Sequence, residues 1–560
     1  MGIELESTKV HGDAMFRAAQ FRAAQFRTAQ LRGLQLRGLQ RRIVLASARP
    51  RVAESLFLAA SLFVAAAPTA ASAGSGEFTI TVVDADTKAT MPCRMHITNE
   101  KEKPQKVGRF PFWHDHFVFP GKMKLKLAKG TYNFVIERGP EYLDMSGYFI
   151  IDNQSKDQKQ IELKRIVNLA EEGWWSVDLH VHRPLKDIEL LMMAEDLHVA
   201  PVITWWNDKS EWSKHPPPDE PVKLFDTNRY YDLLGGEDER EGGALLYFRL
   251  DKPLDLAGAE REYPSPMAFL AQAREQPRAW VDAEKPFWWD LPVWLACGKI
   301  DSIGLCNNHM CRDEMKDNEA WGKPRDVKRL PPPLGNAKWS QEIYYHVLNC
   351  GFRIPPSAGS ASGVLPNPVG YNRIYVWVDP RQFNYDTWWE GFKAGRVVVS
   401  NGPMMRPLAN GRMPGHVFKA DEGDSISLDV VLTYTFREPI TYFELIKNGR
   451  VAQSVRYEEL AKTGHFPPLS FDESGWFLVR AVTDIENTYR FASSGPWYVE
   501  IGENKQPVVK RSAKFFLDWA KERAGRVKLD DADQRREVLR FHEEAIKFWE
   551  ERVEQAEDDE

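Results

Sequence analysis

The sequence has few cysteines and none of the common nucleotide-binding fingerprints. Only 5 of its 560 residues are cysteine, and no two of them form a CxxC pair. There is no phosphate-binding loop, no dinucleotide fingerprint and no G-x-S-x-G at a strand-to-helix turn, so nucleotide-dependent and serine-nucleophile chemistry have no support. The formal net charge is only −6, and the folded region has no basic patch. We therefore expect no nucleic-acid partner.

The odd number of cysteines bears on disulfide bonding. At least one thiol stays free even if the others pair. We interpret them as structural thiols of the core, with one or two disulfides as the alternative in an oxidising compartment. The five are Cys93, Cys297, Cys306, Cys311 and Cys350.

Long apolar runs are scarce, and one near the N-terminus, SLFLAASLFVAAA at 55–67, is too short for a comfortable membrane span. Arginines precede it and the small residues Ala-Ser-Ala follow at 71–73, which is the pattern of a signal peptide. An uncleaved signal anchor is the alternative. We expect an exported, periplasmic or extracellular protein with no stable membrane insertion once the signal is removed.

A five-residue repeat precedes the apolar run. FRAAQ, FRTAQ and LRGLQ units occupy residues 16–40 and contain arginine but no acid. A period of five matches neither a heptad nor a strand. We interpret residues 1–73 as a low-complexity leader plus signal peptide. A start codon assigned too far upstream and a targeting or nucleic-acid arm are alternatives for the repeat.

The whole sequence is 43% hydrophobic, and the residues that follow the leader are too many for one ordinary domain. Alternating runs such as GEFTITVV predict a small antiparallel β-sandwich over 74–168, which resembles carboxypeptidase regulatory-like modules. Similar alternation with N-G turns predicts a second β-sandwich over 411–503. Residues 504–560 are expected to form a helical tail whose acidic end is solvated.

Residues 169–410 show a different pattern, in which strand-like runs alternate with helical or irregular stretches. The clearest helix is expected over 185–197, where Ile188, Leu191 and Met192 share one face. Strands that alternate with helices predict βα units, and about seven of them predict a parallel (β/α) barrel. The expected fold is therefore a multidomain α/β plus β protein with a central barrel between two β-sandwiches.

The stretch SVDLHVH is the first candidate site. Strand alternation places Asp178, His180 and His182 on one side. Two imidazoles two residues apart can chelate one divalent ion, with Asp178 in support. A hydrogen-bonded histidine pair is the alternative.

Polar residues also occur where later strands of the barrel are expected to end. If these ends converge on one face, their side chains form a site; ordinary polar loops are the alternative. These residues are Glu237, Asp238, Glu284, Lys285, Asn307, Asn308 and His309.

Several motifs in this region resemble the polymerase-and-histidinol-phosphatase (PHP) superfamily, and within it the exported CehA/McbA-type metallohydrolases. The motifs are DLHVH, VITWWND, GGEDE, PSAGSAS, NPVGYNRIYV and GFKAGRVVVSNGPM. The resemblance implies a metal-dependent hydrolase in which His180 and His182 form the first metal-binding pair and Glu237 bridges. It also implies further metal ligands that this sequence lacks. Residues that cannot bind a metal, Trp205-Trp206, Ala361 and Gly363, occupy the positions where the family has those ligands.

We therefore predict a PHP-like barrel with a remodelled metal site that binds Zn, Mn or Fe. The predicted ligands are His180, His182, Glu237, Glu284 and His309. The catalytic candidates are Lys285, which stabilises developing negative charge or else pairs with Glu284, and Asp178. The predicted substrate-binding residues are Trp205, Trp206, Asn307, Asn308 and Asp238.

The 19 tryptophans often occur in adjacent pairs. Most are expected to pack in the core, and Trp205-Trp206 is the exception because it occupies ligand positions. The predicted substrate is a small-molecule or glycan ester or phosphoester. The alternative is a catalytically inactive barrel that binds a carbohydrate or another ligand.

Overall fold

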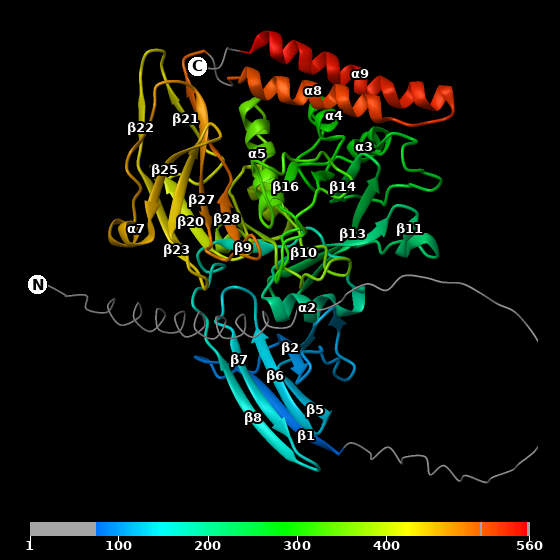
Figure 1. The fold of residues 1–560 in the computed structure, drawn as a ribbon, viewed down its shortest axis with the longest axis vertical. Coiled ribbons are helices and arrows are strands. Elements are labelled where there is room, and N and C mark those ends of the chain that lie inside the picture. The colour runs from blue at the N-terminus through cyan, green and yellow to red at the C-terminus, as the bar shows by residue number, and fades with distance from the viewer. Residues whose placement is uncertain (1–73, 504–506, 557–560) are drawn as a thin grey trace, which may run out of the picture. The chain divides into compact units, whose positions relative to one another are not determined.

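The computed structural model describes residues 74–503 and 507–556 (Figure 1). The predicted leader and signal peptide therefore lie outside the described residues. The chain from Gly74 onward forms one compact unit. Strands make up 36% of the structure and helices 22%.

The first strands form two sheets that enclose their own hydrophobic cluster, which includes Ile80, Met95, Phe117 and Ile136. One sheet has the order β5-β1-β8 and the other the order β3-β4-β2-β6-β7. Most pairs are antiparallel, but β1 and β8 run parallel. The strands are β1 (Ser75–Asp84), β2 (Cys93–Asn99), β3 (Phe112–Trp113), β4 (His116–Phe119), β5 (Lys122–Ala128), β6 (Gly130–Glu137), β7 (Met145–Ile151) and β8 (Lys156–Leu163).

The middle of the chain contains both strands and helices. The strands are β9 (Trp174–Val177), β10 (Val199–Trp206), β11 (Lys209–Ser210), β12 (Val222–Phe225), β13 (Arg229–Arg240), β14 (Gly243–Phe248), β15 (Trp280–Ala283), β16 (Ser302–Cys306), β17 (Pro356–Ala358), β18 (Arg373–Trp377) and β19 (Val397–Ser400). The helices are η1 (Leu185–Asp187), α2 (Ile188–Glu195), η2 (Glu211–Ser213), α3 (Pro266–Arg274), α4 (Leu291–Ala296), α5 (Gly335–Asn349), η3 (Pro380–Gln382) and α6 (Tyr385–Lys393).

The predicted central (β/α) barrel of about seven strands is wrong. Parallel pairs such as β10–β13 and β15–β16 alternate with antiparallel pairs such as β13–β14 and β18–β19. The same sheet continues into the C-terminal strands through the β19–β28 and β21–β29 pairs. A barrel of βα units needs a helix between successive strands. Here β13 turns directly into β14, so that the two strands form a hairpin instead.

The predicted helix over 185–197 is confirmed. One turn of 3-10 helix leads into α2, and α2 ends at Asp196, which has a left-handed backbone with φ of 53°. The expected apolar face is buried, since Ile188, Leu191 and Met192 are each at most 2% exposed. The Asp196 side chain lies at the centre of a charged cluster with three arginines.

The C-terminal strands continue the large sheet and also form two small two-stranded sheets, β20-β23 and β22-β26. These elements are β20 (Met404–Ala409), β21 (Val417–Ala420), β22 (Ile426–Leu428), β23 (Val430–Thr435), β24 (Tyr442–Lys447), β25 (Arg450–Arg456), α7 (Tyr457–Thr463), β26 (Leu469–Phe471), β27 (Gly475–Val482), β28 (Phe491–Ser494) and β29 (Trp497–Ile501).

Two long helices follow, α8 (Lys510–Arg526) and α9 (Ala532–Gln555). They lie side by side, and both contact α4 (Figure 1). Trp519 and Trp549 are completely buried, and Trp549 donates a hydrogen bond from Nε1 to the carbonyl of Pro292 at 3.0 Å. The predicted helical tail thus contributes an apolar face to the main core.

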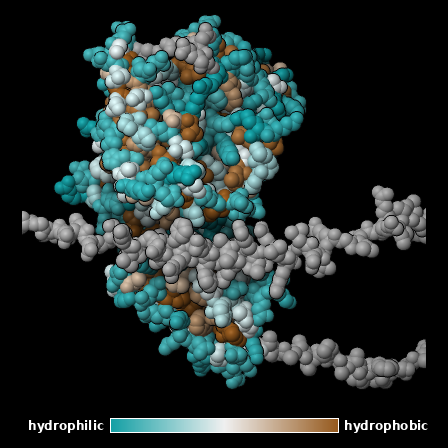
Figure 2. All heavy atoms as spheres, turned by 60° about the vertical axis from the view of Figure 1, so that its left-hand side comes forward, coloured by the Kyte–Doolittle hydropathy of each residue, from teal (hydrophilic) through white to brown (hydrophobic). Residues whose placement is uncertain are grey.

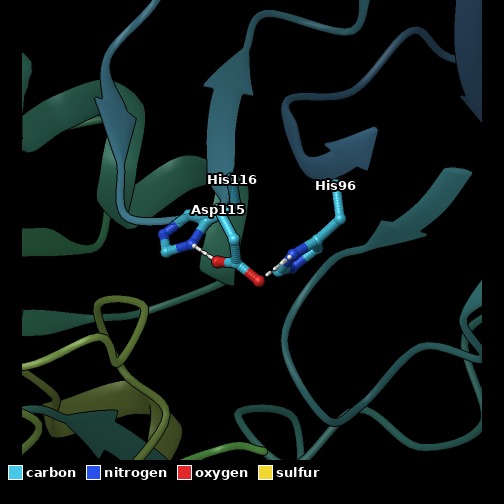
Figure 3. Close-up of side chains that lie close together, drawn as sticks. All are labelled: His96, Asp115 and His116. Carbon is cyan, nitrogen blue, oxygen red and sulfur yellow. Dashed lines mark hydrogen bonds and ion pairs between the residues drawn. The ribbon is translucent and has the colours of Figure 1, made fainter. Parts of the chain in front are cut away.

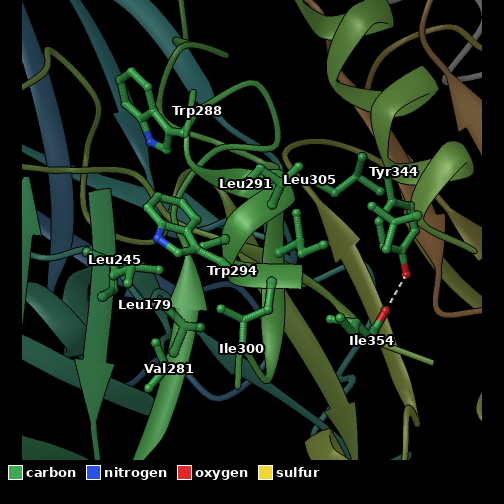
Figure 4. Packing of buried hydrophobic residues seen from close by; sticks show 14 of the residues in the cluster. Leu179, Leu245, Val281, Trp288, Leu291, Trp294, Ile300, Leu305, Tyr344 and Ile354 are labelled. Atoms are coloured by element: carbon green, nitrogen blue, oxygen red, sulfur yellow. Dashed lines mark hydrogen bonds between the residues drawn. The ribbon is translucent and has the colours of Figure 1, made fainter. Parts of the chain in front are cut away.

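The largest hydrophobic cluster is rich in tryptophan. Trp294 and Leu291 of α4 belong to the same cluster as Leu245 of β14 and Val281 of β15 (Figure 4). The adjacent tryptophans at 174–175, 288–289 and 388–389 are all buried, as expected for core packing. The cysteines are free thiols, and only Cys297 is partly exposed.

On the surface, Figure 2 shows hydrophobic residues scattered in small groups among hydrophilic ones on the face drawn. β7 exposes three large hydrophobic side chains, Met145 at 42%, Tyr148 at 69% and Ile150 at 56%. None of the described helices combines the length and the apolar character needed to cross a bilayer.

Candidate metal centre

His180, His182 and Glu237 converge on one point. The Nε2 atoms of the two histidines lie 2.9 Å apart. Glu237 Oε2 lies 3.4 Å from His180 Nε2 and 3.1 Å from His182 Nε2. His180 and Glu237 are both 3% exposed. Glu237 Oε2 is buried and accepts no hydrogen bond of good geometry. Two imidazoles and one carboxylate are thus directed at a common position, as in a divalent-metal site.

Three backbone segments position these side chains. β9 ends at Val177, earlier than predicted, and the chain bends at Leu179 before it reaches Val181. Val181 bridges both Val202 and Ser362, and this holds the histidine segment between two neighbours. Glu237 lies on β13, where it pairs with Trp206 of β10. The convergence therefore depends on main-chain pairing between distant parts of the sequence.

The carboxylates control the charge of His180. Burial alone would lower the pKa of His180, but Glu237 and Glu284 on two sides raise it to about 10. Burial lowers the pKa of His182, even though Glu237 opposes this effect. These directions favour a protonated His180 beside a neutral His182 when no cation is bound, with Glu237 and Glu284 as the carboxylates that stabilise the charge of His180.

Glu284 lies on the other ring nitrogen of His180. Its Oε1 is 3.5 Å from His180 Nδ1, and Glu284 is not among the three residues that converge. Nδ1 of His180 therefore faces a carboxylate and Nε2 faces the candidate metal position. A carboxylate on the far nitrogen of a histidine ligand fixes the tautomer and orientation of the ring. Glu284 thus supports a ligand rather than being one.

Lys285 is occupied by a partner. Its ammonium group donates to Glu284 Oε2 and lies 4.5 Å from the centroid of the Trp288 ring. Trp288 Nε1 donates to the same carboxylate oxygen at 3.0 Å. Of the two predicted roles for Lys285, the structure shows the pairing with Glu284. Its charge holds Glu284 ionised and in place.

His309 and Asp178 are used elsewhere. His309 Nδ1 lies 2.9 Å from the carbonyl of Asn318; burial, with Lys285 nearby, lowers the pKa of His309 to about 3. Asp178 accepts backbone N–H groups of His180, Ser360 and Gly370 at 3.0, 3.0 and 2.7 Å. Neither residue belongs to the converging group. His309 therefore does not face the candidate metal position, and Asp178 connects the backbone of His180 to the backbone of Ser360 and Gly370.

The predicted substrate-binding residues separate into two kinds. Trp206 is the one beside the centre, since its ring is 5.2 Å from the His182 ring. Trp205 points into the core, where it lies flat on Gly236 and its Nε1 donates to the carbonyl of Leu234 at 3.2 Å. An added Cβ on Gly236 would be 1.7 Å from that indole, so glycine is required there.

Three polar candidates have structural roles. Asn307 accepts the backbone N–H of His309 at 3.1 Å. Asn308 donates from Nδ2 to Glu284 Oε1 at 2.6 Å and so helps to hold that carboxylate. Asp238 forms a two-fold ion pair with Arg240, is 1% exposed, and is closed to a substrate.

Glu239 is a further acidic residue of the site, and it was not among the predicted site residues. It lies two residues beyond Glu237 on β13, and therefore on the same face of the strand. It is half-buried and makes no side-chain hydrogen bond within the described residues. Burial and the nearby charge of Glu237 raise its pKa to about 7. The alternation within GGEDE was a signal that would have found it.

A second group, His96, Asp115 and His116, was also missed (Figure 3). His96 and His116 are direct cross-strand partners on β2 and β4. Asp115 lies between them and accepts from both Nδ1 atoms, at 3.0 and 2.9 Å. Burial lowers the pKa of His96, and the guanidinium groups of Arg312 and Arg94 lower it further. Because these groups also repel a cation, this cluster is the weaker metal candidate of the two.

Comparison with known proteins assigns no family. No family model matches the chain, and no curated protein matches it. The solved structures that match include the Bacillus anthracis TIE protein, at TM-score 0.14 and 20% identity over 20% of each chain. Another is a group B streptococcus pilus 2b backbone protein, at TM-score 0.14 and 19% identity over 16% of this chain and 41% of that one. A third is a pilus-presented adhesin, Cpa, at TM-score 0.12 and 11% identity over 78% of this chain and all of that one.

The chain thus spans only a fifth of the length of the first of these structures and about two fifths of the second. TM-scores this low carry no argument about fold or function.

Proposed function

We propose that His180, His182 and Glu237 hold one divalent cation and that the protein hydrolyses an ester or phosphoester at this site. The observation that carries the proposal is the convergence of two imidazole Nε2 atoms on a buried carboxylate oxygen. The resemblance of DLHVH and GGEDE to motifs of exported PHP-type metallohydrolases supports the same activity. An exported location, which rests on residues 1–73, is part of the proposal.

The residues present fit a cation of the Zn, Mn or Fe type. Neutral imidazole and carboxylate are ligands that these ions share. Glu237 Oε2 is buried against the two imidazole Nε2 atoms without a hydrogen bond of good geometry, and a buried carboxylate needs a close positive partner. A bound cation is such a partner and replaces the proton that the histidine pair otherwise holds.

The chemistry divides between the ion and the chain. A divalent cation in this position would supply Lewis acidity and make water a stronger nucleophile at neutral pH. Glu284 orients His180, while Lys285 and Trp288 hold Glu284. Glu239 presents an unpaired carboxyl group on the same strand face as Glu237, where it can accept a proton from the reacting water.

Trp206 links the centre to an open pocket of about 410 Å³. This pocket is also lined by Lys209, Lys214 and His215, and Lys209 Nζ lies 5.4 Å from the centroid of the Trp206 ring. We place the substrate there, with a flat group against the indole. The alternative of an inactive binding protein would have been favoured if Trp205 had filled the centre, but its indole packs in the core instead.

Metal analysis of the purified protein tests the first half of the proposal. We expect about one equivalent of Zn, Mn or Fe per chain, and less than about a tenth of that in the His180→Ala/His182→Ala double variant. His215→Ala is the matched control, because His215 is exposed and outside the group. A metal-free wild type that takes up none of these ions on dialysis would contradict the proposal.

Hydrolysis is tested separately with the metal-loaded protein. On a panel of aryl esters and phosphoesters, Glu237→Gln is expected to lower turnover by about 10²-fold or more, because it removes the charged ligand. If the protein binds the metal but hydrolyses none of these substrates, the proposed metal centre stands and the proposed hydrolase activity is wrong.

A further inference from the structure

A small cavity lies where three parts of the chain meet. Its volume is about 30 Å³, which is room for one or two water-sized molecules. Arg94 and Glu137 reach it from β2 and β6, Arg373 from β18, and Arg490 from the segment before β28. Five arginines and two glutamates line it in all. The lining therefore carries an excess of positive charge around a partly open space.

The carboxylates around the cavity already have partners. Glu137 pairs with Arg94 and lies 3.4 Å from Arg312, and Glu195 pairs with Arg94 at 2.6 Å. Arg490 pairs with Glu438, just outside the lining. None of these ion pairs includes Arg373, the guanidinium group that β18 contributes to the lining.

Arg373 is that group. It is 2% exposed and makes no ion pair within the described part of the chain. Its Nε donates to the carbonyl of Gly370 at 2.6 Å and its Nη2 to the carbonyl of Glu195 at 3.3 Å. Its Nη1 is buried without any acceptor. A buried guanidinium with a free N–H group strongly favours an additional acceptor, best of all a negatively charged one.

A second donor without a partner lies beside it. Tyr375 is two residues along β18 from Arg373 and therefore on the same face. Its hydroxyl is buried, lines the same cavity and faces the Arg373 guanidinium, but it has no hydrogen bond of good geometry. Nε of Arg490 is also buried without a partner. Donor groups of three side chains from two segments thus border one space.

Glycines allow this approach. Gly139 and Gly370 both line the cavity and have left-handed backbone angles, with φ of 56° and 70°. A Cβ on Gly139 would lie 3.5 Å from Arg373 Nη1, and one on Gly370 would lie 3.0 Å from Nη2. The guanidinium is therefore flanked by positions without side chains, which keeps the space beside it open.

We propose that this cavity binds a small monovalent inorganic anion between the Arg373 guanidinium and the Tyr375 hydroxyl. Guanidinium N–H and phenol O–H groups are strong donors to anions. The volume admits an ion the size of chloride or bicarbonate and excludes a sugar, a nucleotide or a phosphoester. The anion connects the N-terminal sheets, β18 and the C-terminal strands, and so stabilises their association. This inference is independent of the proposed hydrolase.

Thermal unfolding in matched salts tests the proposal on the full chain. At equal ionic strength, we expect a Tm about 2–4 °C higher in sodium chloride or bicarbonate than in sodium gluconate, whose anion is too large to enter, with a saturable dose dependence. The chloride and bicarbonate arms distinguish the two sources of the anion. Equal Tm values in all three salts would overturn the proposal.

Two variants separate binding from general salt effects. Tyr375→Phe removes one hydroxyl from the cavity and is expected to lose at least about half of the anion-dependent shift in Tm. Tyr247→Phe is the control, because Tyr247 is also buried with an unpartnered hydroxyl but does not line the cavity. Crystals grown in bromide should show an anomalous peak beside Arg373. A peak only elsewhere, together with an undiminished anion-dependent shift in Tm for Tyr375→Phe, would contradict the site.

Discussion

An Asp196→Ala variant is expected to lose about 3–5 kcal/mol of its free energy of unfolding, because the change leaves buried guanidinium groups without their shared partner. Asp196 is 3% exposed. Its carboxylate lies 3.3 Å from Arg138, 2.5 Å from Arg165 and 2.6 Å from Arg229. Chemical denaturation monitored by tryptophan fluorescence measures the loss.

Asp226→Ala is the matched control for this change. Asp226 also pairs with Arg229, at 3.3 Å, but its side chain is 52% exposed. A surface ion pair of this kind contributes about 0–1 kcal/mol. Equal losses in the two variants would show that burial of the Asp196 cluster does not determine its energetic contribution.

The same cluster predicts a direction for acid sensitivity. Burial alone would raise the pKa of Asp196, but Arg138, Arg229 and Arg165 hold it well below its ordinary value. A carboxylate with a lowered folded-state pKa contributes its full stability above the unfolded value of about 3.9. The contribution is lost as the pH falls below that value, and the Asp196→Ala variant should therefore show a weaker acid dependence than the wild type.

A Trp549→Ala variant is expected to lose a similar amount, about 3–5 kcal/mol, through the cavity it creates. Trp549 is fully buried, its ring lies 4.8 Å from that of Phe516, and its Nε1 donates to Pro292. Denaturant unfolding again provides the measurement.

Glu550→Ala is the neighbouring control, since the Glu550 side chain is 49% exposed and pairs with Lys521 on the surface. We expect its effect to stay below about 1 kcal/mol. If Trp549→Ala unfolded at the same denaturant concentration as this control, α9 would have to be peripheral to the core rather than part of it.

Local features could be predicted from the sequence where a short pattern determines them. The apolar spacing of Ile188, Leu191 and Met192 is sufficient to place α2. The burial of most of the paired tryptophans and of most of the cysteine thiols was also predictable, because these side chains are hydrophobic. The approach of His180 and His182 to Glu237 was expected from motif resemblance, and the structure places these three side chains together.

Features that depend on long-range pairing could not be predicted. Whether β13 pairs with β14 in parallel or as a hairpin depends on the short turn at 241–242, and the strand pattern alone does not distinguish these cases. Glu284 was expected on the metal side of His180, but side-chain direction placed it at Nδ1. The cavity beside Arg373 is lined by three segments that are distant in the sequence, and no local pattern in any one of them predicts it.

The position of α9 has a consequence for the order of folding. Because Trp549 of α9 packs into the same cluster as Trp175, the central core is complete only when α9 has docked on it. The N-terminal sheets enclose a cluster of their own, so they can close before the central region does.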